Sequence, residues 1–173
     1  PVCQAKIGFF PDVAASYFLN NCPGEIGMYL ALTGDTISGE DAFYSGLATH
    51  FVSKDNISNL LNALFSSPFT SDLPIKQQLS KILSAYACVP SSSRLLVLQP
   101  IIDMHFSKDS VEAILASLQK DSSEFAVQTY KRIRANGPLA VKVAFEQMRR
   151  ARSMSLKEIY QMEFRFVNFY DTK

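Results

Sequence analysis

The most informative segment of the chain is residues 7–19, Ile-Gly-Phe-Phe-Pro-Asp-Val-Ala-Ala-Ser-Tyr-Phe-Leu. Asp12 follows a proline, and an aspartate in this position is typical of the residue that caps a helix, here one expected over residues 14–19. Because Phe9 and Phe10 precede it, its carboxylate would lie between an apolar surface and the positive end of a helix. Asp12 is therefore either a plain helix cap or a group with a chemical role.

The segments that follow are short and are separated by glycine or proline. An apolar run predicts a helix over residues 25–32. Ser38 and Asp41 form an acidic variant of the capping box, which predicts a third short helix that ends at Gly46. Residues 47–52, Leu-Ala-Thr-His-Phe-Val, are the best candidate for a β-strand because they are partly β-branched. The first 53 residues are therefore interpreted as a compact α/β segment.

From residue 54 onward the apolar residues recur at helical spacing. The pattern predicts helices around residues 57–64 and 111–118, and Gly137-Pro138 marks the start of another. A second capping box, Ser155 with Glu158, predicts the start of a last helix. The apolar residues expected to face the core on the last two helices are Val141, Ala144, Phe145, Met148, Ile159, Met162 and Phe166. Phe164 and Phe169 lie close to the same face of the last helix or flank it, so we expect this helix to be well buried.

The composition excludes several classes of protein. The 173 residues are 47% hydrophobic and 19% charged, which is typical of a globular chain with one core. The net charge of +1 gives no general field that would attract nucleic acid or an anionic membrane. The apolar runs are far shorter than the ~20 residues of a membrane span, so we expect no membrane partner.

The cysteines and histidines do not form a metal-binding pattern. None of Cys3, Cys22, Cys88, His50 and His105 lies in a CxxC, HxxxH or CxxH arrangement, so we expect no metal and no cofactor. The cysteines are most simply small apolar fillers. The histidines are interpreted as hydrogen-bonded structural residues.

Two clusters of basic residues lie in the second half of the chain. Such clusters are most often solvated helix faces. The alternative is contact with an anion, either the phosphates of CoA or an RNA backbone. The six residues are Lys131, Arg132, Arg134, Arg149, Arg150 and Arg152.

Residues 7–19, together with Ala31-Leu-Thr-Gly34 and residues 46–52, resemble the active-site region of the 3-hydroxyisobutyryl-CoA hydrolase family, a branch of the crotonase superfamily. The likeness continues more loosely through residues 110–114, 137–142 and Met162-Glu-Phe-Arg165. It implies that residues 1–53 are the C-terminal part of a crotonase-like core, built as a spiral of ββα repeats. Residues 54–173 would then be a helical C-terminal region, so that this chain is mostly helical within an α/β fold.

The resemblance also implies a reaction, the hydrolysis of the thioester of 3-hydroxyisobutyryl-CoA in mitochondrial valine breakdown. In the family, two backbone N–H groups hold the thioester oxygen, a glutamate acts as nucleophile or base, and the motif aspartate orients the reacting groups. Here the aspartate is Asp12, whereas Gln4 occupies the glutamate position, and a neutral amide cannot accept a proton near pH 7. By the same resemblance, Phe10 and Tyr17 are expected to bind the substrate.

Two hypotheses for the function follow. The first is a catalytically impaired relative that serves as a structural component of the small subunit of the mitochondrial ribosome, and Gln4 favours it. Its partners would be ribosomal proteins and rRNA, contacted through the two basic clusters. The alternative is an active acyl-CoA thioester hydrolase, also mitochondrial, whose partner is acyl-CoA.

Overall fold

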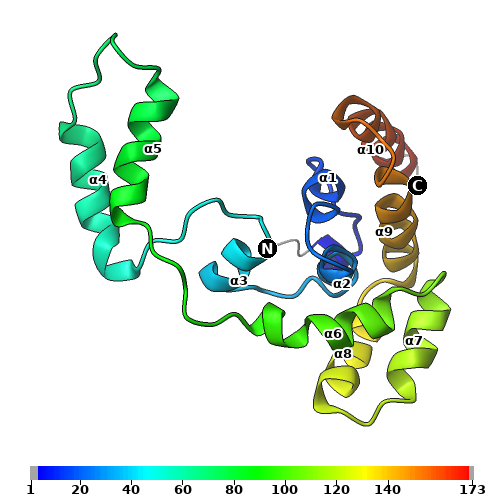
Figure 1. The fold of residues 1–173 in the computed structure, drawn as a ribbon. Coiled ribbons are helices and arrows are strands. Elements are labelled where there is room, and N and C mark those ends of the chain that lie inside the picture. Colours follow the sequence, from blue (N-terminus) through cyan, green and yellow to red (C-terminus); the bar gives the residue numbers. More distant parts are fainter. Residues whose placement is uncertain (1–3, 172–173) are drawn as a thin grey trace.

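The computed structural model describes the backbone of residues 4–171 and the side chains of residues 5–168. All the regular elements in this part of the chain are helices, and most of them gather around one core (Figure 1). The elements in chain order are η1 (Gln4–Ile7), α1 (Ala15–Leu19), α2 (Ile26–Thr33), α3 (Gly39–Tyr44), η2 (Lys54–Asn56), α4 (Ile57–Ser66), α5 (Ile75–Tyr86), α6 (Arg94–Phe106), α7 (Val111–Gln119), α8 (Glu124–Ala135), α9 (Pro138–Ala151) and α10 (Leu156–Asp171).

Helix α2 lies at the centre of the core. All of its residues are buried, which is the expected environment for a helix that is apolar on every side. It packs against α1, α6, α8 and α9. The predicted helix over residues 25–32 is therefore confirmed, with its boundaries moved by one residue to Ile26–Thr33.

Helices from both predicted segments share this core. Leu32 on α2, Ile102 on α6, Ile114 on α7 and Met148 on α9 belong to one buried apolar cluster. A smaller cluster joins the chain before α1 to the last two helices, through Ala14, Ala151, Ile159 and Met162. The division of the chain at residue 53 into a core segment and a helical region therefore stays a prediction.

The apolar stripes predicted for the last two helices are mostly confirmed. Val141, Ala144, Phe145 and Met148 are buried on α9, as are Ile159 and Met162 on α10, while Phe166 is partly buried against them. Phe164, expected close to this face or beside it, is 67% exposed, so α10 is less fully buried than expected. It follows directly after Glu163, which is buried, so its side chain points to another face of the helix. The side chain of Phe169 lies outside the described residues.

Both predicted capping boxes are present. At α3 the side chain of Ser38 accepts a hydrogen bond from the Asp41 N–H, and the Asp41 carboxylate accepts one from the Ser38 N–H. At α10 the backbone N–H and the hydroxyl of Ser155 both donate to Glu158 Oε2 over 2.7 Å. These local pairs begin their helices where the sequence pattern predicts.

The predicted strand over residues 47–52 is wrong. The segment is irregular, with bends at Leu47 and Thr49, and no strand is present among residues 4–171 to pair with it. Isolated backbone bonds hold the segment instead, from the Ala48 N–H to the Ala42 carbonyl and from the Cys88 N–H to the Phe51 carbonyl, each 2.9 Å long. The described part of the chain is therefore helical rather than mixed.

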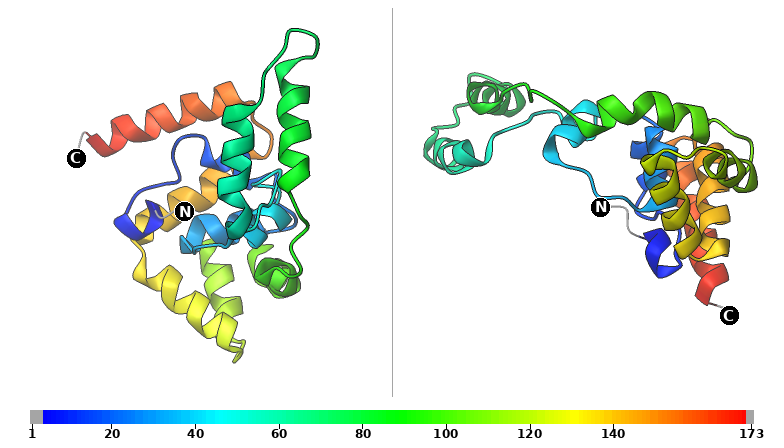
Figure 2. Two further views of the ribbon diagram at one scale, coloured as in Figure 1. Left: turned by 90° about the vertical axis from the view of Figure 1, so that its left-hand side faces the viewer. Right: turned by 90° about the horizontal axis from the view of Figure 1, so that it is seen from below.

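Helices α4 and α5 form a hairpin that projects from the rest of the molecule (Figures 1 and 2). The two helices pack against each other, and neither contains a buried residue. In the apolar stripe predicted over residues 57–64, Leu60 and Leu64 are half-buried, whereas Ile57 and Leu61 are exposed. Nowhere in residues 4–171 does a helix have the length and apolar character needed to cross a bilayer.

Candidate functional site

Asp12 lies in a tight turn between η1 and α1. The two residues that follow it, Val13 and Ala14, have positive φ angles of 50° and 59°, in the left-handed region that favours glycine. Such residues cost on the order of 1–3 kcal/mol each and persist where the surrounding structure holds them. The N-cap of α1 is Ala14, which makes no side-chain capping bond, so the prediction that Asp12 caps this helix is wrong.

The start of α1 is capped by a carboxylate from the far end of the chain. The backbone N–H of Ala14 donates to both oxygens of Glu163 on α10, over 3.1 and 3.0 Å. Glu163 is only 5% exposed. A carboxylate at this point satisfies an N–H group that has no partner within the helix, and it faces the positive end of the helix dipole.

Gln147 on α9 ties the turn to the same carboxylate. Its side-chain Nε2 donates to the Pro11 carbonyl over 2.6 Å and approaches Glu163 Oε1 at 3.3 Å and Ser16 Oγ at 3.5 Å. Gln147 is fully buried, and its Oε1 has no hydrogen-bond partner among the described residues. Contacts from α9 and α10 therefore fix the backbone on both sides of Asp12.

The charge of Asp12 acts on Glu163. Burial raises the pKa of the Glu163 carboxyl, and the nearby carboxylate of Asp12 raises this pKa further. The hydrogen bonds from Ala14 and Gln147 oppose both effects, because they stabilise the charged form. Two carboxyl groups thus lie close enough to interact at this turn.

Gln4 lies at the start of η1, and its side chain is outside the described residues. Cys3, the residue before Gln4, is outside the described residues altogether. The replacement of a glutamate by Gln4 therefore remains a prediction from the sequence resemblance.

The two predicted substrate-binding aromatic residues have different environments. Phe10 is fully buried, stacked on Phe9 with 4.3 Å between ring centroids and packed edge-on against Phe166 at 5.2 Å. Tyr17 on α1 is 40% exposed, and its ring packs edge-on against Phe18 with 5.7 Å between ring centroids. Substrate binding by either residue stays a prediction, and for Phe10 the structure shows a packing role beneath the Asp12 turn.

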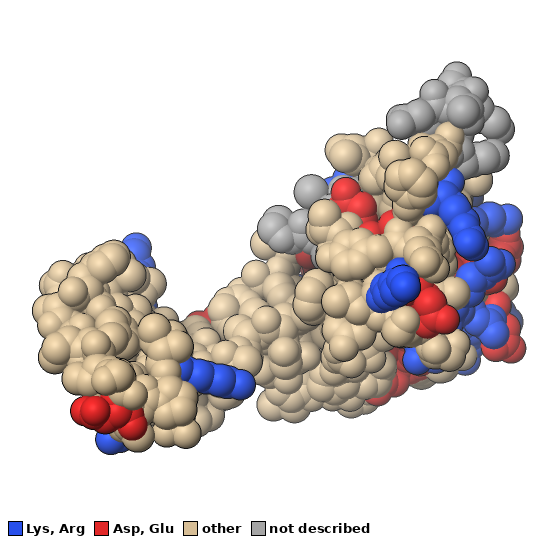
Figure 3. Space-filling view, turned by 90° about the horizontal axis from the view of Figure 1, so that it is seen from above, with Lys and Arg blue, Asp and Glu red and all other residues tan. Residues whose placement is uncertain are grey.

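Most of the arginines in the two basic clusters already have acidic partners. Their nearest ion-pair distances are 2.9 Å for Arg132 to Asp35, 4.0 Å for Arg149 to Asp109, 2.7 Å for Arg150 to Glu146 and 2.7 Å for Arg152 to Glu25. The space-filling view shows the same pattern, with basic and acidic side chains side by side (Figure 3). The clusters therefore form a mixed surface rather than a positive one.

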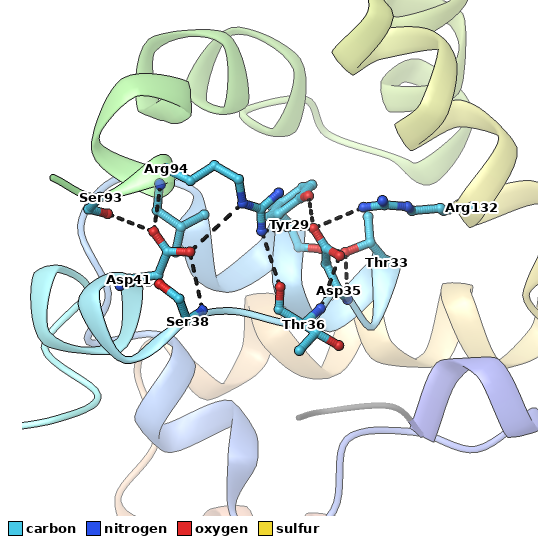
Figure 4. Close-up of polar contacts among 10 residues, drawn as sticks. Tyr29, Thr33, Asp35, Thr36, Ser38, Asp41, Ser93, Arg94 and Arg132 are labelled. Carbon is cyan, nitrogen blue, oxygen red and sulfur yellow. Dashed lines mark hydrogen bonds and ion pairs between the residues drawn. The ribbon is translucent and has the colours of Figure 1, made fainter. Parts of the chain in front are cut away.

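Arg132 belongs to a polar network centred on Asp35 (Figure 4). The Asp35 carboxylate accepts hydrogen bonds from the Tyr29 hydroxyl at 2.5 Å and Arg94 at 3.1 Å, in addition to the pair with Arg132. Burial raises the pKa of Asp35, but the Tyr29 hydrogen bond and the two guanidinium charges outweigh it and hold the pKa below 3.8. Burial, followed by the hydrogen bond to Asp35, raises the pKa of Tyr29 to about 12.

Asp41 forms the second half of this network. Its carboxylate accepts from Ser93 Oγ at 2.7 Å, from the Leu95 N–H at 2.9 Å and from the Ser38 N–H at 3.3 Å. Arg94 lies between the two aspartates, with its Nε 3.8 Å from Asp41. The network joins the segment after α2 to α6 and α8, which gives it a structural role.

His105 is also held in a structural arrangement. Its ring is 1% exposed and lies between Ser117 Oγ at 2.8 Å and Asp121 Oδ2 at 3.0 Å. These contacts join α6 to α7 and to the loop that follows it. They agree with the interpretation of this histidine as a hydrogen-bonded structural residue.

The fold matches solved structures of the crotonase type. A carnitinyl-CoA dehydratase from Mycobacterium thermoresistibile shares 32% identity and a TM-score of 0.83, over 94% of this chain and 45% of that one. An enoyl-CoA hydratase from Rhodobacter sphaeroides shares 30% identity and a TM-score of 0.77, over 94% and 44%. The chain is thus the helical C-terminal part of a crotonase fold.

Residues 2–170 match the enoyl-CoA hydratase/isomerase family model, and the chain belongs to this family. Relatives include proteins called mitochondrial 3-hydroxyisobutyryl-CoA hydrolase from Xenopus tropicalis (36% identical), Dictyostelium discoideum (38%) and Homo sapiens (33%). Each alignment covers 94% of this chain and 42% of the relative, so the chain spans less than half the length of these proteins. The family resemblance read from the sequence is confirmed.

Sequence reasoning missed the roles of Glu163 and Gln147. Glu163 stands in a block, Met162–Arg165, that resembles the family, and this likeness is the one signal that could have singled it out. Nothing in the spacing relates it to Ala14, which is 149 residues away.

Proposed function

We propose that this chain supplies the C-terminal part of an acyl-CoA site of the thioester-hydrolase type, with Asp12 as its acidic group, in a mitochondrial protein. The observation that carries the proposal is the Asp12 turn, which is held from both sides by buried contacts of Gln147 and Glu163. The names of the relatives, 3-hydroxyisobutyryl-CoA hydrolase, support the substrate class and the compartment.

In the proposed reaction a water molecule adds to the thioester carbonyl, and the C–S bond then breaks to give a carboxylic acid and free CoA. Asp12 would orient the reacting groups through its carboxylate. Gln4 lacks the lone-pair basicity of a carboxylate, so the step that needs a base or nucleophile would be slow in this protein.

The test is release of CoA from 3-hydroxyisobutyryl-CoA by the full-length protein. We expect a low rate for the natural protein and a rate raised by about 100-fold or more in the Gln4→Glu variant, since a positioned base contributes 10²–10⁴-fold. Asp12→Asn in the Gln4→Glu background should remove most of this gain. If neither the natural protein nor the Gln4→Glu variant releases CoA faster than the uncatalysed hydrolysis in solution, the proposal of a hydrolase site is wrong.

A second candidate is a structural component of the small subunit of the mitochondrial ribosome, and the neutral Gln4 favours it. The internal ion pairs of Arg132, Arg150 and Arg152 weigh against broad rRNA contact through the basic clusters. Sedimentation of a mitochondrial lysate through a sucrose gradient separates the two candidates. Migration of the protein with the small subunit would favour the structural role, and migration as a light species would favour the enzyme.

A further inference from the structure

The Asp12 turn has an unusual feature that the proposed reaction does not use. Val13 and Ala14 take up left-handed backbone angles without being glycine, and the only described side-chain carboxylate that bonds the Ala14 N–H comes from α10. Both oxygens of Glu163 receive this single N–H, at 3.1 and 3.0 Å. The interaction joins two points 149 residues apart in the sequence.

Gln147 adds further side-chain contacts to the bond between Glu163 and Ala14. Its Nε2 donates to the carbonyl of Pro11, the residue before Asp12, and lies 3.3 Å from Glu163 Oε1. Glu163 in turn accepts from the N–H of Ala14, two residues after Asp12. Ser16, which lies 3.5 Å from Gln147 Nε2, is fully buried, as are Ala14 and Gln147. The backbone before and after Asp12 is thereby fixed to α9 and α10, while Asp12 itself is partly exposed.

We propose that Glu163, together with Gln147, is a positioning residue for Asp12, because it holds the left-handed turn that sets the direction of the Asp12 side chain. The proposal rests on the proposed function in so far as Asp12 is the acidic group of the site. Without the carboxylate, the Ala14 N–H would lose its charged acceptor with two oxygens, and the turn could relax toward ordinary backbone angles. Asp12 would then keep its chemistry but lose its placement, and such a misplacement costs rate rather than affinity.

The first experiment measures the turn itself, by amide hydrogen exchange of the full-length protein at residues 11–16. Glu163→Gln, which keeps the size of the side chain, should speed exchange of the Ala14 N–H by about tenfold or more, since a protecting hydrogen bond is weakened. Glu146→Gln on the neighbouring helix α9 is the matched control, because Glu146 is exposed and its ion-pair partner, Arg150, is exposed as well. Unchanged exchange at Ala14 in Glu163→Gln would overturn the proposal.

A second variant separates positioning from simple packing. Glycine adopts left-handed angles without strain, so a turn that carries Ala14→Gly needs the carboxylate less. In a double-mutant cycle, Glu163→Gln should therefore accelerate exchange at the turn less in the Ala14→Gly background than in the natural one. If Glu163 only packed α10 onto the core, the two changes would be independent, and that outcome would contradict the proposal.

The kinetic readout uses the Gln4→Glu background, in which hydrolysis is expected to be measurable. Adding Glu163→Gln should lower kcat about tenfold or more and leave KM within about twofold, because the site still binds acyl-CoA but Asp12 is displaced. A rise in KM with an unchanged kcat would contradict the role. Should Gln4→Glu show no activity, the proposed function fails, whereas the exchange data still decide whether Glu163 holds the turn.

Discussion

Gly27 on α2 lies directly against the backbone of Leu19 at the end of α1. A Cβ atom added to Gly27 would come within 2.0 Å of the Leu19 carbonyl oxygen, which is closer than real contacts allow. Because both partners are main chain, neither can move aside by changing a rotamer. Glycine at this position therefore allows α2 to pack closely against the end of α1, the helix that follows the Asp12 turn.

The Gly27→Ala variant should be strongly destabilised. Overpacking typically costs about 1–3 kcal/mol, and we expect the upper end or more because the contact is with backbone atoms. Urea unfolding followed by circular dichroism measures the loss. Gly39→Ala is the control, since its Cβ would meet only the side chain of Phe51, at 3.2 Å, and should cost less than about 1 kcal/mol. Equal effects of the two changes would contradict this account of the α1–α2 contact.

Asp41 should contribute stability that depends on pH. Although burial raises the pKa of this carboxyl, the hydrogen bonds from Leu95, Ser93 and Ser38 and the charge of Arg94 hold it below 3.8. A carboxyl group whose pKa is lowered by folding stabilises the folded state at pH values above its ordinary pKa. This stability is lost as the pH falls through the lower pKa that the group has in the folded state. We expect Asp41→Asn to cost about 2–4 kcal/mol near neutral pH.

The difference in stability between the natural protein and Asp41→Asn should shrink as the pH falls below the ordinary aspartate pKa and through the lower folded-state pKa of Asp41, because the natural carboxylate then becomes protonated. Urea unfolding near pH 7 and near pH 3 measures both values. Asp72→Asn, at an exposed position in the α4–α5 loop, serves as the control and should stay within ~0.5 kcal/mol. A difference for Asp41→Asn that is constant with pH would contradict the prediction.

Val13 offers a direct test of the strain in the Asp12 turn. Its side chain is 70% exposed and its φ is 50°, so a glycine here would remove strain without removing buried surface. Because a β-branched residue is especially disfavoured at such angles, Val13→Gly should raise the free energy of unfolding by about 1 kcal/mol. Val13→Ile keeps the β-branch and should have no such effect. A destabilised Val13→Gly protein would show that the turn is not strained.

The two described cysteines should differ in reactivity. Cys22 is 7% exposed, and burial raises the pKa of its thiol to about 11, whereas Cys88 is exposed. The prediction of small apolar fillers thus holds for Cys22 and is wrong for Cys88. A thiol reagent near neutral pH should label the peptide that contains Cys88 well before the one with Cys22, because the thiolate is the reactive form. Peptide mapping by mass spectrometry measures both rates, and faster labelling of Cys22 would contradict the structure.

The parts of the fold that the sequence predicts correctly depend on residues close together in the chain. Ser38 with Asp41 and Ser155 with Glu158 are three residues apart, and each pair caps its helix as predicted. Helical stripes such as the one on α9 are predicted for the same reason, since the period of the helix brings their residues to one face. A strand is different, because it needs a partner from elsewhere, and residues 47–52 have none in the described part of the chain.

Prediction of the candidate site is limited in the same way, because its contacts join residues that are far apart in the chain. Its family likeness and Asp12 could be read from residues 7–19, but the helix cap assigned to Asp12 is made by Glu163, which packs across from α10. The basic clusters were visible as charges, and Glu146 lies only four residues from Arg150, but the other acidic partners, Asp35, Glu25 and Asp109, come from distant parts of the chain. Tertiary contacts of this kind leave no periodic signal in a single sequence.

The most direct test of the central claim is acyl-CoA binding by the full-length protein, measured by isothermal titration calorimetry with a non-hydrolysable thioether analogue of 3-hydroxyisobutyryl-CoA. Binding does not require the base that Gln4 replaces, so it tests the site separately from catalysis. We predict saturable binding at one site per chain, displaced by free CoA. Absence of any saturable binding, in protein shown to be folded by circular dichroism, would contradict the assignment of an acyl-CoA site.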